Sequence, residues 1–365
     1  MKNVLFILTD LQGGGAERVT LNLIRELNRN EFRPSLFLIK RSGALLPNIP
    51  TDVPVKWALQ PDQRISRNIP KVIVSLIRAA RDADVLVGAL ELTATYFAAI
   101  AGQWLNRPVI GWVHTNLKQY PPAKGFLHSK LLKWIYPRLT SVIIVSRGAS
   151  KAIVELVPKL ASKIKVINNL IPLNTIHELS KGASPFDKTL PVLISAGRLV
   201  YEKGFDILIK AHAKLISKGV KHRLIILGEG PEKTNLQNLV ENLGVQNSIL
   251  FAGFHTNPYI WIKNSTIFAL SSRFEGFSLV LLEAMLLGIP VISTNCPDGP
   301  AEILEDGKYG KLVPHEDINS IAEAIESLLT NESLALHYKA QGLERAQHFS
   351  VERILPQFEK VLLES

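Results

Sequence analysis

Hydrophobic residues in this chain gather in short continuous runs, separated by longer segments in which they recur every three or four positions. The runs occupy residues 4–8, 85–87, 109–113, 142–145, 192–196, 224–227, 267–270 and 291–293. Continuous runs of this length are typical of parallel strands buried on both faces, and the periodic segments between them predict amphipathic helices. The pattern therefore predicts an α/β protein built on doubly wound parallel sheets.

Two stretches of the chain begin alike, which suggests that one unit occurs twice. In each, a strand (4–8 or 192–196) leads through a glycine-containing loop into a helix with one apolar face. The expected faces consist of Val19, Leu23 and Leu27 in one helix and of Ile207, Ala211 and Leu215 in the other. Segment 181–188 carries glycine, serine and proline without periodicity and is the best linker. We expect two Rossmann-like domains, 1–180 and 181–348, that face each other across a cleft, with ligands beyond the carboxyl ends of the strands.

Composition narrows the class of protein. The chain has 365 residues, 47% of them hydrophobic, and one cysteine, Cys296, which excludes an internal disulfide and a zinc site built on several thiolates. The apolar residues after Met1 are too few for a signal peptide, and the stretch 92–105 is too short to span a bilayer. These features predict a cytoplasmic protein, either soluble or peripheral at the inner face of the membrane.

The net charge of +10 is unevenly distributed. Residues 1–180 hold 24 Lys/Arg against 11 Asp/Glu, whereas residues 181–365 hold 18 against 21. The stretch between Glu91 and Glu155 contains no acidic residue and eight basic ones, namely Arg107, Lys118, Lys124, Lys130, Lys133, Arg138, Arg147 and Lys151. Such a field attracts nucleic acid, acidic lipid headgroups or phosphorylated substrates, although a solvated basic face is an equal alternative. No nucleic-acid recognition module accompanies it, so we expect no nucleic-acid partner.

Segment 124–136 indicates which anionic partner the basic region binds. It interleaves lysines with aromatic and aliphatic residues, and as a helix it would place Leu127, Leu131 and Ile135 on one face. Tryptophan and tyrosine beside lysine suit the headgroup layer of an anionic membrane. We therefore expect the 118–151 region to dock on such a membrane; the alternatives are an apolar face packed on the domain core and a soluble anionic acceptor.

The segment 271–290 carries the clearest candidate chemistry. Ser278 is suited to cap a helix that runs to about residue 287, where Gly288 and Pro290 end it. Within that helix Glu283 is the one polar residue, and a buried carboxylate requires partners. The hydroxyls of a ribose would supply them, and so would a structural salt bridge; the sequence leaves both open.

Glu275 precedes that helix, close to the backbone N–H groups of Phe277, Ser278 and Leu279, which form a ready anion site. Eight helical positions separate two residues by roughly 12 Å, whereas hydrolytic carboxylate pairs stand about 5 to 9.5 Å apart. The spacing of Glu275 and Glu283 therefore suits one extended ligand held at two points.

Three further places lie at expected strand ends. Arg198 and Lys203 flank a helix start, where two cations suit a diphosphate, although ordinary loop cations would look the same. His114 ends the run 109–113 and is the best placed histidine for chemistry. The loop Gly13-Gly14-Gly15 lets a ligand approach the backbone closely. The sequence offers no pair of histidine, cysteine or acidic residues with metal-ligand spacing at these candidate sites, so we expect neither a metal nor a cofactor.

Together these motifs resemble the retaining glycosyltransferases of family 4, which have the GT-B fold. The most specific motif is Glu275, seven residues, then Glu283, set in Ser-Arg-Phe-Glu-Gly-Phe-Ser and Glu-Ala-Met-x-x-Gly-x-Pro-Val-Ile. The supporting motifs are Gly-Gly-Ala-Glu-Arg at 14–18, Val-Ser at 145–146, Gly-Arg-Leu-x-x-Glu-Lys-Gly at 197–204 and Leu-Gly-Glu-Gly-Pro at 227–231. The resemblance covers nearly the whole chain.

The resemblance implies a role for each matched position. Glu283 binds the ribose of a nucleotide-sugar, Glu275 touches the transferred sugar with His114 beside it, and Arg198 and Lys203 hold the leaving diphosphate. The other implied substrate contacts are Gly14 and Gly15 to the phosphates, Gly230 and Phe254 to the base, and the backbone of Gly276, Phe277, Ser278 and Leu279 to the sugar hydroxyls and phosphate. Residues 349–365 would cross back to the N-terminal domain.

The implied activity is transfer of a hexosyl or N-acetylhexosaminyl group, with retention and without a metal, from a UDP-sugar (GDP being possible) to a glycan or lipid-linked acceptor. The segment 295–302 resembles family members that extend lipid-linked oligosaccharides or build polysaccharides, and Cys296 within it is expected to be buried. Two alternatives belong to other classes: a non-catalytic nucleotide-sugar-binding protein, and a nicotinamide-dependent oxidoreductase, for which the GxGxxG loop is missing.

Overall fold

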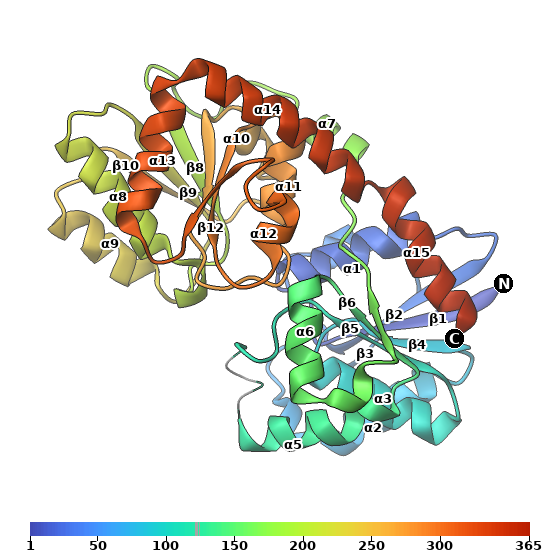
Figure 1. The fold of residues 1–365 in the computed structure, drawn as a ribbon. Helices are drawn as coiled ribbons and strands as arrows, with labels where there is room; N and C mark the ends of the chain where they lie inside the picture. Colours follow the sequence, from blue (N-terminus) through green and yellow to red (C-terminus); the bar gives the residue numbers. More distant parts are fainter. Residues whose placement is uncertain (121–122, 124) are drawn as a thin grey trace. The chain divides into compact units, whose positions relative to one another are not determined.

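A computed structural model describes residues 1–120, 123 and 125–365, which form two compact units (Figure 1). Unit 1 comprises Met1–Leu170 together with Val351–Ser365, and unit 2 comprises Ile171–Ser350. The sequence placed the corresponding boundaries at 180 and 348. The chain therefore leaves unit 1 once and returns to it for its last helix.

Unit 1 is built on a seven-stranded parallel sheet with the order β3-β2-β1-β4-β5-β6-β7. Its strands are β1 (Lys2–Leu8), β2 (Phe32–Lys40), β3 (Val55–Leu59), β4 (Val85–Gly88), β5 (Val109–Val113), β6 (Ser141–Ile144) and β7 (Ile164–Val166). The strands β1, β4, β5 and β6 are almost entirely buried, because helices cover both faces of the sheet. Neighbouring parallel strands bring their carboxyl ends to the same edge.

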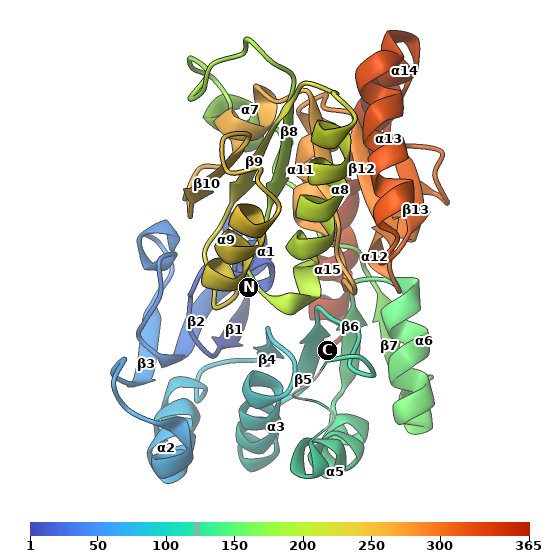
Figure 2. The same cartoon turned by 90° about the vertical axis from the view of Figure 1, so that its left-hand side faces the viewer.

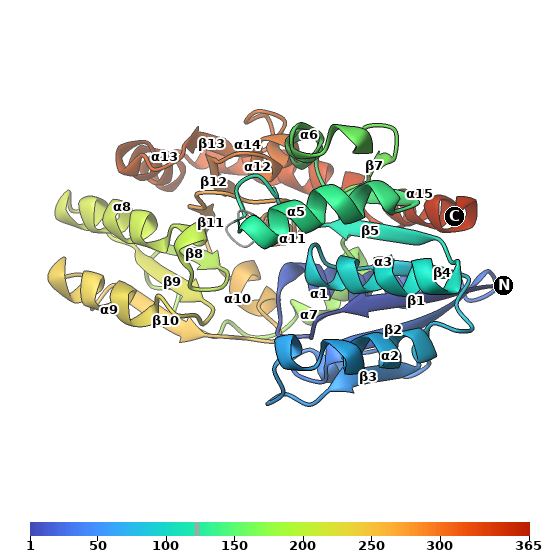
Figure 3. The same cartoon turned by 90° about the horizontal axis from the view of Figure 1, so that it is seen from below.

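The helices of unit 1 form two layers. On one face α2 (Ile69–Ala79), α3 (Thr93–Leu105) and α5 (Phe126–Ile135) lie side by side (Figures 2 and 3). On the other face lie α1 (Gly15–Glu26) and the last helix of the chain, α15 (Val351–Glu364) (Figure 1). Helix α6 (Arg147–Leu156) follows β6 and begins at Ser146, whose hydroxyl accepts a hydrogen bond from the N–H of Ala149.

Unit 2 repeats the plan with six parallel strands in the order β10-β9-β8-β11-β12-β13. These are β8 (Val192–Ala196), β9 (Arg223–Leu227), β10 (Ile249–Gly253), β11 (Ile267–Leu270), β12 (Val291–Asn295) and β13 (Lys311–Pro314). Its helices are α7 (Leu173–Leu179), α8 (Phe205–Ser217), α9 (Lys233–Asn242), α10 (Tyr259–Lys263), α11 (Leu279–Leu286), α12 (Gly299–Leu304), α13 (Ile318–Thr330) and α14 (Glu332–Ala346).

The structure confirms the predicted fold class. Each of the eight apolar runs overlaps a parallel strand, and both predicted helix faces are buried. The pattern missed β2, β3, β7, β10 and β13, most of which lie at sheet edges and are partly exposed. In the described part of the chain, we find no helix that combines the length and apolarity needed to cross a bilayer.

Candidate active site

In unit 2 the loops that follow β8, β9 and β11 press against one another, backbone to backbone. A Cβ atom on Gly228, which has φ +137°, would lie 1.9 Å from the carbonyl oxygen of Gly197. A Cβ atom on Gly204, at φ +60°, would lie 2.1 Å from the carbonyl oxygen of Ser271. Only glycine fits such approaches. These contacts fix the loop 197–204, which carries Arg198 and Lys203, against the loop that carries Glu275.

Lys203 and Glu275 meet directly as a result. The Lys203 ammonium donates to Oε1 of Glu275 at 2.6 Å, and the hydroxyl of Ser272 donates to the same oxygen at 2.7 Å. Glu275 is only 8% exposed, so its charge depends on these two donors. Arg198 lies on the same loop, with its side chain exposed to solvent.

Arg273 anchors this region, and the sequence analysis did not single it out. Its guanidinium group donates to both carboxylate oxygens of Asp206 at 2.9 Å, to Glu316 at 3.0 Å and to the carbonyl oxygen of Tyr201 at 2.8 Å. It also stacks over the Tyr201 ring, 4.0 Å from the centroid. Bidentate pairs of this kind are rigid, so Arg273 holds the short turn Tyr201–Lys203 in place.

Helix α11 begins after Ser278 and ends at Leu286, with Gly288 at φ +71° closing it, as the sequence predicted. The expected capping hydrogen bond of Ser278 is wrong: its backbone occupies the N-cap position, but its side chain makes no cap bond. The buried Ser278 hydroxyl has no hydrogen-bond partner among the described residues. Because φ and ψ at Ser278 (−82°, 97°) already direct the chain into the helix, the backbone supplies the turn and leaves the hydroxyl available.

Around that helix start, the implied contacts lie close together. Gly276 packs tightly against Gly299: a Cβ atom added to Gly299 would lie 2.9 Å from the carbonyl oxygen of Gly276. Phe277 is buried with its ring 5.5 Å from that of Phe349, and Leu279 is the first residue of α11. The structure thus brings Glu275 to Leu279 into one short loop at the carboxyl end of β11.

Glu283 lies in the middle of α11 and is 6% exposed. The phenol hydroxyl of Tyr259, in α10, donates to its Oε1 atom at 3.1 Å. The partner that the sequence required therefore includes a tyrosine, which no pattern in the sequence marked out. A phenol and a carboxylate together present both donor and acceptor capacity, as a pair of ribose hydroxyls requires.

The two residues assigned to the base lie apart from this loop. Gly230 packs against Leu199, whose carbonyl oxygen would be 2.3 Å from a Cβ atom at that position. Phe254 follows β10 and is exposed. The ring of Phe254 is therefore exposed for stacking. Gly230 allows the loop after β9 to pack closely against the loop after β8.

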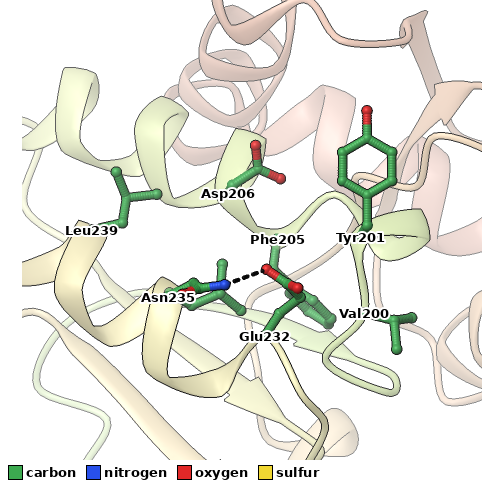
Figure 4. A pocket seen from close by; sticks show the side chains of 8 residues that line it. Val200, Tyr201, Phe205, Asp206, Glu232, Asn235 and Leu239 are labelled. Atoms are coloured by element: carbon green, nitrogen blue, oxygen red, sulfur yellow. Dashed lines mark hydrogen bonds between the residues drawn. The ribbon is translucent and has the colours of Figure 1, made fainter.

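A small pocket near Arg198 has a different character (Figure 4). Val200, Tyr201 and Phe205 line one side, and Glu232 and Asn235 line the other, joined by a hydrogen bond of 3.0 Å. Asp206 adds a second carboxylate, and the lining contains no lysine or arginine within the described chain. This pocket does not suit a phosphate.

In unit 1 the glycine loop leads into α1, with Gly14 at the N-cap and Gly15 as the first helical residue. The side chain of Glu17 folds back onto this loop, so that a Cβ atom on Gly14 would lie 2.5 Å from its Oε2 atom. Burial, with the nearby charge of Asp10, raises the pKa of Glu17 to about 7, although the backbone of Gly13 and Gly14 opposes the shift. The carboxyl therefore occupies the anion-binding start of the helix.

His114 follows β5, as the sequence predicted, and its ring lies 4.5 Å from that of Trp112. Neither ring nitrogen makes a well-formed hydrogen bond with the described residues, although the backbone of Ala89 lies close enough to interact with the ring. Burial lowers the pKa of His114 to about 3, and only the backbone of Ala89 opposes this shift. The imidazole is therefore neutral at physiological pH.

Glu91 lies beside His114 and was missed as a candidate. Its Oε2 atom accepts a hydrogen bond of 3.1 Å from the backbone N–H of His114, and burial raises its pKa. The available signal was its position just beyond the run 85–87, one strand over from His114 in a parallel sheet.

Two further expectations concern metal binding and the single cysteine. In the part of the chain that the structure describes, no cluster of three or more histidine, cysteine or acidic side chains is arranged to hold a metal ion. Cys296 is buried, as predicted, and burial raises the pKa of its thiol, which disfavours a nucleophilic role.

A second surface of interest, the aromatic–basic face, is the exposed side of α5 and of the short turn Tyr136–Arg138 that follows it, with Phe126, Leu127, Lys130, Lys133, Trp134 and Arg138. Three of its apolar side chains are exposed by 76% (Phe126), 64% (Leu127) and 55% (Trp134). The Lys130 ammonium lies 4.1 Å from the Phe126 ring centroid, and the Arg138 guanidinium lies 4.3 Å from that of Trp134. Cations and rings therefore alternate on one solvent-facing surface.

The structure corrects two details of that region. Leu127, Leu131 and Ile135 recur every four positions on α5, as predicted, but they are not buried together. Leu127 is exposed, Leu131 is partly buried, and the core contacts of the helix are Leu132 and Ile135. Lys118 is paired with Glu155 at 2.6 Å, so its charge is compensated. Lys124 lies outside the described residues.

Comparisons with known proteins find two family models that together match most of the chain. The family model described as "Glycosyl transferases group 1" matches residues 177–345, and the one described as "Glycosyltransferase Family 4" matches residues 13–175. An uncharacterized glycosyltransferase of Methanocaldococcus jannaschii is 32% identical over 301 residues, which are 71% of this chain and 72% of that protein.

Two further proteins are similar to this chain. An N-acetylgalactosamine-N,N'-diacetylbacillosaminyl-diphospho-undecaprenol 4-alpha-N-acetylgalactosaminyltransferase of Campylobacter jejuni is 30% identical, over 64% of this chain and 62% of that protein. Alr3699/HepE of Anabaena, crystallised with UDP and glucose, superposes with a TM-score of 0.85 at 23% identity over the whole of both chains. At that identity the likeness shows the shared fold.

Proposed function

The chain belongs to the group 1 glycosyltransferases of family 4, with the GT-B fold, and we propose that it transfers a hexosyl or N-acetylhexosaminyl group from a UDP-sugar to a lipid-linked or oligosaccharide acceptor, with retention of configuration. Membership of this family excludes the oxidoreductase alternative. The observation that carries the proposal is the loop of unit 2 in which Lys203, Ser272 and Glu275 converge beside the start of α11.

In this proposal the donor extends along that loop. The ribose hydroxyls bind Glu283 and Tyr259, and the diphosphate binds Arg198 and Lys203. Glu275 and the backbone from Gly276 to Leu279 bind the sugar. Phosphate binding at Lys203 exchanges one anionic partner for another, because the ammonium already holds Glu275 at 2.6 Å.

Retention follows from a reaction on one face of the sugar. The bond from the anomeric carbon to the diphosphate oxygen breaks as the acceptor oxygen bonds to the same carbon from the same side. The leaving phosphate oxygen takes the acceptor's proton. Arg198 and Lys203 stabilise the charge that accumulates on the diphosphate, which is where fixed cations lower a barrier most. Two cations at this position also supply the charge that a divalent metal would otherwise provide.

Two similarities support the choice of substrates. Alr3699/HepE was crystallised with UDP and with glucose, and the Campylobacter enzyme is named for a diphospho-undecaprenol acceptor. We extend both properties to this chain as part of the proposal, with GDP as the second candidate nucleotide.

The aromatic–basic face supports action at a membrane surface. Exposed tryptophan, phenylalanine and leucine suit the boundary between headgroups and acyl chains, and the interleaved cations suit anionic lipid. Each cation near such a surface contributes about 1 kcal/mol. A reversible, salt-sensitive association at the inner face of the membrane would place the enzyme beside a lipid-linked acceptor.

The test of the activity is a panel of UDP- and GDP-sugars. A true donor at a hundred times its dissociation constant should raise the free energy of unfolding by about 2.7 kcal/mol. Release of nucleoside diphosphate that depends on a lipid-linked acceptor, with an anomeric product configuration equal to that of the donor, would support the proposal. Inversion would refute retention, and activity that EDTA abolishes and magnesium or manganese restores would refute the metal-free reaction.

Sedimentation with lipid vesicles tests the membrane association. Binding to vesicles that contain acidic lipid should exceed binding to neutral vesicles at low salt, and should fall when Lys124, Lys130 and Lys133 are changed to glutamate. Lys218→Glu with Lys221→Glu in unit 2 is the control for a change of net charge. Equal binding to both kinds of vesicle would refute the docking.

A further inference from the structure

The carboxyl ends of β4 and β5 in unit 1 bring two polar side chains together, those of Glu91 and His114. Glu91 lies in the loop between β4 and α3, and His114 follows β5 directly. The backbone N–H of His114 donates to Oε2 of Glu91 at 3.1 Å. Because β4 and β5 are neighbours in a parallel sheet, their ends share the edge at which α/β sheets bind ligands.

Several polar atoms of this place are poorly satisfied by the described residues. The Nε1 atom of Trp112 is buried without a hydrogen-bond partner among them, and the ring nitrogens of His114 find no well-formed hydrogen bond there, only an interaction with the backbone of Ala89. Leaving a buried donor or acceptor unsatisfied costs about 1 to 3 kcal/mol. Native proteins seldom tolerate such a group unless it serves a ligand or a water molecule.

The backbone beside Glu91 is strained and firmly held. Leu92 has φ +57° and ψ −108°, a conformation that a leucine rarely adopts. Its N–H donates to the hydroxyl oxygen of Tyr136 at 3.2 Å, and Tyr136 is fully buried. Strain of this kind persists only where surrounding contacts enforce it, and it concentrates at functional sites. The carboxyl of Glu91 is thereby fixed before any ligand arrives.

The charges around the pair indicate the class of ligand. Burial lowers the pKa of His114 to about 3, so its imidazole is uncharged near neutral pH, and burial raises the pKa of Glu91. Tyr136 and Tyr96 pack here as well, and burial raises the pKa of both phenols. The pair therefore offers the donor and acceptor nitrogens of a neutral imidazole and the oxygens of a carboxyl group, but no positive charge. They suit the hydroxyls of a sugar ring and do not suit a phosphate.

We propose that Glu91 and His114 form a hydroxyl-binding pair for a sugar ring, in which the Glu91 carboxyl, held by the backbone N–H of His114, binds one hydroxyl and the imidazole of His114 binds a second. This rests on the proposed function and adds Glu91 to it as a binding residue. The ring belongs either to the transferred sugar of the donor or to the acceptor, and the kinetic test separates the two.

Two substitutions of Glu91 test the inference. Glu91→Gln keeps an acceptor for the His114 N–H and an uncharged donor, whereas Glu91→Ala removes both. We expect Glu91→Ala to raise KM for one substrate roughly tenfold or more. A rise for the donor assigns the ring to the transferred sugar, and a rise for the acceptor assigns it to the acceptor. The affinity for UDP, which carries no sugar ring, should stay unchanged.

The pH profile of kcat/KM is the readout that a purely structural role would not move. We expect the wild type to lose activity as rising pH ionises Glu91, and Glu91→Gln to remain active at neutral pH without that loss. Inactivation by Glu91→Gln at neutral pH, or an unchanged profile, would overturn the inference. Glu155→Gln on α6, an exposed carboxylate, is the matched control, and thermal unfolding reports whether Glu91→Ala still folds.

Failure of this inference differs from failure of the proposed function. A protein that transfers sugar while Glu91→Ala and Glu91→Gln leave both KM values unchanged refutes only the role of Glu91. A folded protein that neither binds UDP or GDP nor releases them from their sugars refutes the proposed function itself.

Discussion

The ammonium of Lys203 and the carboxylate of Glu275 form a 2.6 Å ion pair. The pair joins the loop after β8 to the loop after β11, and the hydroxyl of Ser272 donates to the same carboxylate oxygen. Two groups assigned to different parts of the donor are therefore linked directly to each other. A change at either position acts on both.

Lys203→Ala should lower kcat by about 10²- to 10³-fold, with a smaller effect on KM, because charge on the leaving diphosphate is greatest in the transition state. Arg198→Ala should act in the same direction without exposing Glu275 to the loss of its cation. Steady-state kinetics with saturating acceptor checks this, with Lys218→Ala as the control. A raised KM with unchanged kcat would show that these residues only bind the donor.

Glu283→Gln should weaken UDP binding roughly tenfold to a hundredfold while the protein stays folded, since hydrogen bonds to a charged group contribute about 1.5 to 3 kcal/mol. Tyr259→Phe removes the phenol that contacts Glu283 and should weaken UDP binding less. Calorimetric titration of both variants gives the dissociation constants. Wild-type affinity in a folded Glu283→Gln variant would assign the carboxylate a structural role.

Acid should destabilise unit 2 through a buried histidine pair. His212 Nδ1 lies 2.9 Å from His222 Nε2, and His222 Nδ1 donates to the carbonyl oxygen of Val220, so both rings are neutral in the folded state. Burial lowers the pKa of His212 to about 3, below its ordinary 6.5, and also lowers that of His222. Between the folded-state pKa of His212 and its ordinary value of 6.5, the unfolded chain binds more protons than the folded protein. The free energy of unfolding therefore falls as pH falls, by about 1.4 kcal/mol per pH unit for one such group.

Chemical denaturation between pH 7 and pH 5 measures that slope. The double variant His212→Gln, His222→Gln should lose much of it, although His114 keeps a similar contribution because its pKa is lowered as well. Equal slopes for the variant and the wild type would contradict the role of the pair.

Glu17→Gln should stabilise the protein at alkaline pH. Burial raises the pKa of Glu17 from 4.5 to about 7, so the folded state holds a proton that the unfolded chain has released. Stability therefore falls as pH rises through this window, and above it the charged side chain costs on the order of 1 to 3 kcal/mol. The gain from Glu17→Gln should appear at pH 8 and vanish near pH 4.5. A gain that does not depend on pH would point to packing instead.

The sequence predicted the central strands because burial on both faces leaves a continuous apolar run, as in Val109–Val113. It missed β2, although that strand lies inside the sheet, because Arg33 and Pro34 interrupt the run near its start. The edge strand β13 is four residues long with only one buried position, so it leaves no continuous apolar run in the sequence.

The candidate site was predictable where one local segment carries it, as with Glu275, Glu283, Arg198 and Lys203. Tyr259 was not, because its contact with Glu283 joins two helices 24 positions apart. Glu91 was missed for a similar reason. It became a candidate only because it contacts His114, which follows the neighbouring strand, and the order of strands in the sheet is needed to see that the two meet. The sequence analysis used Glu91 only as the end of an acid-free stretch, and the burial that raises the pKa of its carboxyl is visible only in the fold.

Helix α15 gives the order of synthesis a structural consequence. Its Phe358 ring packs 4.7 Å from Trp112, which in turn lies beside His114, and the ammonium of Lys2 donates to the carbonyl oxygen of Leu362. Unit 2 is one uninterrupted stretch of chain, whereas unit 1 needs residues that the ribosome adds only after the whole of unit 2. Unit 1 is therefore synthesised first but completed last. Until α15 packs onto it, the strand β5, which precedes His114, lacks the contact between Trp112 and Phe358.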